Sequence, residues 1–140
     1  AFAVLAALPF FMAWVPPHQY DSLVYHLPLP EAYLRAGRIV GVEHILYSWF
    51  PQNGEMLFAL ALAFGSDLCA QLWSWLAAVV CAAWLYADGA RRGEAGRGLL
   101  ASLLLLSHTA VMLLASITYV ETLMMLWVTG AVLCWRRGVE

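Results

Sequence analysis

The sequence predicts an all-α protein, a polytopic transmembrane helical bundle of about four spans. Hydrophobic residues make up 64% of the 140 residues, charged residues make up 11%, and the mean hydropathy is +0.76. Soluble domains carry about 25% charged residues, so this chain has too little polar surface to cover a water-soluble globule. Its apolar residues also gather in long runs separated by short polar segments, as in helices that cross a bilayer.

The spans are predicted from length, because a spanning helix needs about 20 largely apolar residues. We expect the first span at 1–15, as the visible tail of a longer helix, and further spans at 68–86, 99–115 and 119–135. A signal peptide is a competing interpretation of the first run, but no basic residue precedes it. All of these runs belong to one multi-span membrane domain.

The run 55–64 is apolar but too short to span. It has Asn53 at a plausible cap position and stops at Gly65, which predicts a short helix lying at the membrane interface. A single bent helix over 53–86, kinked at 65–67, is the alternative.

Arginines predict the orientation. Three lie in the segment 88–98 and two follow residue 135. Two spans separate these regions, so both lie on one face, which the positive-inside rule makes cytoplasmic. The loop 16–54 and the turn 116–118 are then expected outside.

The outer loop is predicted to hold two short amphipathic helices lying against the membrane. The first covers 18–27 and ends at Pro28 and Pro30. Its apolar stripe contains Tyr20, Leu23, Val24 and Leu27, and its polar stripe contains His18, Asp21, Ser22, Tyr25 and His26. The second opens at Pro30, carries a Glu31–Arg35 pair and stops at Gly37. From the residues alone, a plain solvated surface loop is the simpler interpretation.

The segment YDSLVYHLP, followed by YLRAGRI, resembles the first periplasmic loop of bacterial GT-C glycosyltransferases. This superfamily includes the aminoarabinose transferases and the protein O-mannosyltransferases of the family 39 type. The later NGE at 53–55 and GSD at 65–67 resemble the continuation of that loop. The resemblance implies an enzyme of the bacterial inner membrane that moves a sugar from a polyprenyl-phosphate-linked donor to an acceptor at the periplasmic face.

The same resemblance implies roles for two acids. Asp21 corresponds to the family's loop aspartate, the expected catalytic base and metal-contacting carboxylate. Glu121 stands where the family has a second acid, usually Asp, at the entrance to the fourth span. If a divalent metal ion takes part, Asp21, Glu121 and His18 are its expected ligands.

Four further residues of the loop are expected to bind substrate. Arg35 or Arg38, or a divalent cation, would neutralise the donor phosphate, because guanidinium groups suit that contact. Tyr25 and His26 would lie beside the sugar-phosphate head. The acceptor is not indicated, membrane lipid is the expected surrounding, and no nucleic-acid partner is expected.

Glu121 is also a candidate without the resemblance, because a carboxylate at the rim of an apolar span is costly. Thr118, Thr122 and Thr129 are expected on one helix side, as a polar stripe facing the bundle interior. The alternative is an interfacial Glu121 that reaches water. His108 is expected to form a hydrogen bond between helices rather than to act as a ligand.

The competing function is a non-catalytic polytopic protein, such as a transporter subunit or an assembly factor. A transporter predicts charged or broken helices at mid-membrane. The spans show none in the sequence pattern, which favours the enzyme.

Overall fold

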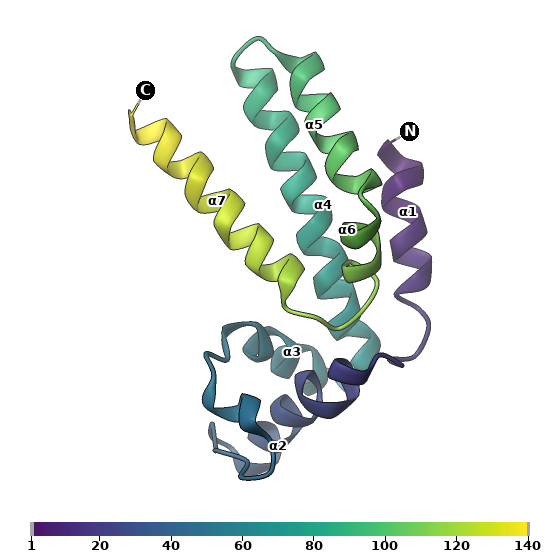
Figure 1. Ribbon diagram of the computed structural model, residues 1–140, viewed down its shortest axis with the longest axis vertical. Helices are drawn as coiled ribbons and strands as arrows, with labels where there is room; N and C mark the ends of the chain where they lie inside the picture. Colours follow the sequence, from purple (N-terminus) through teal and green to yellow (C-terminus); the bar gives the residue numbers. More distant parts are fainter. Residues whose placement is uncertain (1, 140) are drawn as a thin grey trace.

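The structure, a computed structural model, describes residues 2–139, and every regular element in that range is helical (Figure 1). The elements are α1 (Phe2–Met12), the π-helical η1 (Ser22–His26), α2 (Pro28–Ala36), the 3₁₀-helical η2 (Leu46–Trp49), α3 (Asn53–Ala63), α4 (Asp67–Arg91), α5 (Ala95–Ser107), α6 (Thr109–Leu114) and α7 (Glu121–Val139). The predicted all-α class is confirmed.

The helices form an elongated bundle with a smaller module at one end (Figure 1). Helices α1, α4 and α5 lie side by side along the long axis, and α7 leans away from α4 toward the C-terminus. The segment 16–63, which we call the loop module, packs through α3 against the start of α4. The predicted outer loop is therefore a folded body rather than an extended connection.

Four spanning helices are not supported by helix length. Among the described residues, α4 alone is long and apolar enough to cross a bilayer, whereas α1, α3 and α5 are shorter apolar helices. Helix α7 has 19 residues, but Glu121 and two arginines occupy its ends. The number of spans therefore stays a prediction.

The third predicted span, 99–115, is broken in the middle. Helix α5 ends at Ser107 and α6 begins at Thr109, with His108 between them in an extended conformation (φ −70°, ψ 122°). The Ser107 hydroxyl donates to the carbonyl of Leu104 at 3.1 Å, and such local bonds compete with helix continuation. His108 is exposed and has no side-chain hydrogen bond in the described range, so the predicted interhelical bond is absent.

Helices α3 and α4 are separate, so the alternative of one bent helix over 53–86 is wrong. The turn between them contains Gly65 at φ +81°, a left-handed conformation that glycine adopts without steric cost. The short helix predicted at 55–64 corresponds to α3.

The prolines of the loop module open a helix rather than ending one. Only Leu27 separates η1 from α2, and Pro28 occupies the first turn of α2, where its missing N–H costs nothing. Gly37 ends α2 at φ +64°, and the Glu31–Arg35 pair forms, both as predicted.

The first loop helix turns part of its polar stripe into the protein and part of its apolar stripe outward. Ser22 and His26 are buried, whereas Tyr20 is 75% exposed and Leu23 is 53% exposed. The polar face is turned inward because its side chains have partners there: the Ser22 hydroxyl donates to the Thr118 carbonyl at 3.1 Å. Outward apolar side chains suit a lipid surface better than water.

The arginine-rich segments meet at the end of the bundle opposite the loop module (Figure 1). The buried carboxylate of Asp88 in α4 accepts hydrogen bonds from Arg91 and Arg92, both at 3.1 Å. Arg136 of α7 lies 3.4 Å from the same carboxylate. These contacts fix both arginine segments on one face.

Helix α1 is tied to α4 by two side chains that bond its carbonyls. The Gln71 amide nitrogen donates to the carbonyls of Ala13 and Val15, at 3.0 and 2.7 Å. The Trp75 indole N–H donates to the Ala6 carbonyl at 2.8 Å. The chain therefore enters the loop module from a fixed point beside α4.

Candidate functional site

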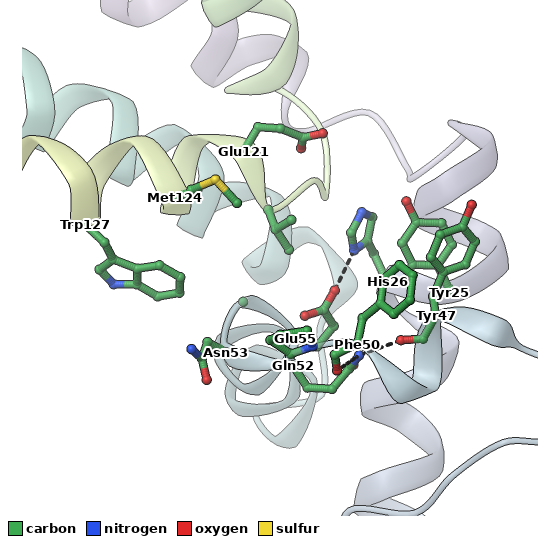
Figure 2. Close-up of a pocket in the computed structure, with 13 residues that line it drawn as sticks. Tyr25, His26, Tyr47, Phe50, Gln52, Asn53, Glu55, Glu121, Met124 and Trp127 are labelled. Atoms are coloured by element: carbon green, nitrogen blue, oxygen red, sulfur yellow. Dashed lines mark hydrogen bonds and ion pairs between the residues drawn. The ribbon is translucent and has the colours of Figure 1, made fainter.

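A cavity of about 410 Å³ lies between the loop module and the start of α7 (Figure 2). Three of its lining residues carry an imidazole or a carboxylate: His26, Glu55 and Glu121. The remaining lining residues are Tyr25, Tyr47, Phe50, Pro51, Gln52, Asn53, Gly54, Val120, Met124 and Trp127. This combination of aromatic walls with a few polar groups is typical of small-molecule sites.

A buried irregular segment, 115–120, positions Glu121. The carbonyls of Thr118 and Tyr119 accept hydrogen bonds from the hydroxyls of Ser22, at 3.1 Å, and Ser74, at 3.2 Å. These bonds satisfy backbone groups that no helix pairs. They fix the point at which α7 begins, and with it the first residue of that helix.

His26 and Glu55 form a buried pair on the cavity wall. The His26 Nδ1 lies 2.9 Å from the Glu55 Oε1, with side-chain exposures of 4% and 8%. The imidazole is held between aromatic rings, with centroid distances of 4.2 Å to Tyr25, 5.3 Å to Tyr119 and 6.1 Å to Phe58. The ring therefore has a fixed position and a fixed hydrogen-bond direction.

The side-chain amide of Gln52 bonds to the backbone of the aromatic wall, which consists of Tyr25, Tyr47 and Phe50. Tyr25 stacks on Tyr47 at 4.2 Å, and Tyr47 meets Phe50 edge to face. The Gln52 amide nitrogen donates to the carbonyls of Tyr47 and Phe50, and its oxygen accepts from Tyr33. Because the backbone of the wall is bonded, its rings are pre-positioned.

Asp21 does not line the cavity, but its carboxylate interacts with Tyr25 of this wall. Burial, a hydrogen bond with the Asp21 carboxylate and the charge of that carboxylate raise the pKa of Tyr25 well above its usual value. Burial and the charge of Asp21 also raise the pKa of Tyr119. The Glu121 carboxylate acts on both phenols in the same direction. The two predicted acids therefore lie around the same pair of tyrosines.

The other predicted ligands are not gathered at the cavity. His18 is exposed, with its Nδ1 3.3 Å from the Pro16 carbonyl. Arg35 and Arg38 are exposed on and after α2, and neither lines the cavity. Within residues 2–139, no three His, Cys, Asp or Glu side chains are grouped to hold a metal ion. The trio of Asp21, Glu121 and His18 does not fit a divalent ion, and we assign no step to one.

The threonine stripe is partly as predicted. Thr118 and Thr122 are buried, and their hydroxyl oxygens have no hydrogen-bond partner among the described residues, whereas Thr129 is half-buried. Glu121 is exposed while lining the cavity, so it reaches both water and the site.

Sequence reasoning missed Glu55. The signal was present, because Glu55 opens the apolar helix α3 and a carboxylate in such a place is costly unless it has a partner. The same argument singled out Glu121. The partner, His26, is 29 positions away, and no local pattern joins the two.

Comparison with known proteins finds a match for one segment of the chain. This segment of 55 residues is 36% identical to an uncharacterized protein of Shigella flexneri. The matched segment covers 39% of this chain and 28% of that protein, so the chain corresponds to less than a third of the relative's length. No protein-family model and no solved structure matches the chain.

Proposed function

We propose that this chain is part of a membrane glycosyltransferase that moves a sugar from a polyprenyl-phosphate-linked donor to an acceptor at the outer face. The observation that supports it most is the cavity at the end of the bundle opposite the arginines, with carboxylates, an imidazole and aromatic walls. Its volume lies in the range of sites that hold a small molecule, roughly 300–1,000 Å³.

Exposed apolar side chains support a membrane location. They run along the helices α1, α4, α5 and α7 and include Val4, Leu8, Phe11, Leu76, Trp84, Leu100, Leu104, Met124, Val128 and Val132. So much apolar surface is unfavourable in water and suits lipid or further helices. We propose that α1, α4, the α5–α6 pair and α7 cross the membrane, with the Asp88 end in the cytoplasm and the loop module outside.

The reaction sets two demands that this site addresses. The acceptor hydroxyl must lose a proton to a base, and positive charge that develops at the sugar must be stabilised. Glu121 places a negative charge on the cavity wall, and the negative charge of Asp21 acts on Tyr25. Arg35 and Arg38 stay predictions for the phosphate, because both lie away from the cavity wall.

An assay of sugar transfer tests the proposed function directly. The full-length protein in lipid nanodiscs should transfer label from polyprenyl-phosphate hexoses to acceptors in a membrane extract. Glu121→Gln should lower the rate about tenfold or more, the effect of losing about 1.4 kcal/mol of electrostatic stabilisation. Glu94→Gln, which changes an exposed acid at the arginine end, is the matched control and should leave the rate unchanged. A protein that neither binds nor uses any such donor would refute the function.

Thiol labelling tests the orientation. In a variant without Cys69, Cys81 and Cys134, a cysteine at Glu43 of the outer loop should react with an impermeant thiol reagent added outside, and one at Ala95 should not. Both positions are exposed, so accessibility of the side chain does not limit either reaction. The reverse labelling pattern would place the cavity in the cytoplasm.

One observation favours the non-catalytic alternative. The break between α5 and α6 at His108 is the kind of discontinuity that binding sites in transporters use. A transporter subunit would bind its solute without turning over a lipid-linked sugar, so the transfer assay separates the two functions.

A further inference from the structure

We propose that the general base of this reaction is the His26–Glu55 pair, with Asp21 as a positioning residue that acts through Tyr25. This inference rests on the proposed function and assigns its proton-accepting group. It differs from the role that family resemblance gives to Asp21.

The hydrogen bond fixes the tautomer of His26. A carboxylate accepts hydrogen bonds, so the contact of 2.9 Å places the imidazole proton on Nδ1, directed at Glu55. The lone pair is then on Nε2, which points away from Glu55 (Figure 2). Nε2 has no hydrogen-bond partner among the described residues, and His26 lines the cavity. A base oriented by a buried carboxylate is the arrangement that activates hydroxyl nucleophiles in unrelated enzymes.

The charged side chains around the His26 imidazole are acidic. The charged groups nearby are all carboxylates: Glu55 on α3, Glu121 on α7 and Asp21 beside η1. Tyr25 and Tyr119, which touch the ring, have raised pKa values and stay neutral. Among residues 2–139, no Lys or Arg lines the cavity. The described part of the site therefore holds negative charge, and no positive charge, beside the group that is proposed to accept the proton.

Asp21 is less suited to take the proton. Asp21 does not line the cavity. Its charge acts on the phenol of Tyr25, and the ring of Tyr25 contacts His26 at a centroid distance of 4.2 Å. Its contribution to the reaction therefore passes through Tyr25.

The proposed reaction is a substitution at the anomeric carbon of the donor sugar. The acceptor oxygen attacks the anomeric carbon and forms the new glycosidic bond. The bond between that carbon and the phosphate oxygen breaks, and its electron pair leaves with the polyprenyl phosphate. The hydroxyl proton moves to His26 Nε2 and is later released to water.

The experiment measures turnover against pH for the full-length protein, with a labelled polyprenyl-phosphate hexose as the probe. His26→Gln should lower turnover about 10²–10⁴-fold, with little change in the KM for the donor. Glu55→Gln keeps an oxygen that accepts from Nδ1 but removes the charge. It should shift the acidic limb of the profile to lower pH, because the imidazolium ion is less stabilised. His44→Gln, an exposed loop histidine, is the matched control and should change neither quantity.

Asp21→Asn distinguishes the two bases. Asparagine still offers an oxygen to Tyr25, so turnover should fall modestly and the acidic limb should remain. Loss of that limb in Asp21→Asn, with near-normal turnover in His26→Gln, would overturn the assignment and leave the proposed function intact. If the His26→Gln protein does not fold, an unshifted pH profile of turnover in Glu55→Gln would be sufficient to refute the assignment of His26 as the base. A wild-type protein without donor binding or transfer would refute the function and the base together.

Discussion

Replacing Gly98 by alanine is expected to destabilise the pairing of α4 with α5. A Cβ atom at Gly98 would lie 2.9 Å from the Tyr86 carbonyl oxygen and 3.1 Å from the Gly89 Cα and the Leu85 carbonyl oxygen. All three are backbone atoms of α4, which cannot rotate away as a side chain can. Overpacking of this kind costs typically about 1–3 kcal/mol and occasionally more, so thermal unfolding in detergent should begin at a clearly lower temperature.

Gly96→Ala provides the control for this prediction. Gly96 lies in the same helix, and a Cβ atom there would meet nothing within 4 Å. Alanine should raise helix stability by up to about 1 kcal/mol at such a position. Equal unfolding temperatures for the Gly96 and Gly98 variants would show that the close approach of α4 and α5 does not exist in the protein.

Gly54→Ala is expected to impair the site itself. A Cβ atom at Gly54 would lie 2.5 Å from the Cγ1 and 3.0 Å from the Cβ of Val120. Val120 lines the cavity and precedes Glu121, so relief of the clash moves the start of α7 away from α3. A misplacement that costs about 1.4–2.8 kcal/mol in the transition state corresponds to about a 10- to 100-fold loss of transfer.

A compensating substitution makes this second prediction specific. In the double variant Gly54→Ala with Val120→Ala, the Val120 Cγ1 methyl that would lie 2.5 Å from the new Cβ is removed and the 3.0 Å contact with the Cβ of residue 120 remains. Most of the transfer activity should therefore return. The two single variants and the double variant form a cycle whose coupling energy should be favourable. Additive losses would mean that Gly54 acts through something other than its contact with Val120.

The helical class and most helix positions could be predicted from composition and periodicity. The break at His108 could not, because a mostly apolar run such as 99–115 can hold a few polar residues within a continuous helix, and its interruption depends on local bonding by Ser107. The inward polar face of η1 was also missed. Periodicity identifies which residues share a helix face, but the partners of Ser22 and His26 lie far along the chain, at 118 and 55.

The two acids singled out from the sequence differ in position. Glu121 lines the cavity and Asp21 does not, although both interact with Tyr25, and their roles stay predictions. The Glu31–Arg35 pair was predicted from the sequence, but the phosphate-binding role implied by the family resemblance has no support in the placement of Arg35, which does not line the cavity. Glu55 and His26 needed the tertiary structure, because their contact joins α3 to η1.

The interruption at His108 has a consequence for what surrounds the bundle. The extended residue leaves the first N–H groups of α6 without the partners that a continuous helix would supply. Hydrocarbon offers no hydrogen bonds, so irregular backbone at membrane depth is tolerated only against protein or a water-filled space. If the α5–α6 pair crosses the membrane as proposed, lipid would be excluded from the exposed side of residues 107–109. Another stretch of polypeptide or a hydrated channel would then lie against the α5–α6 junction.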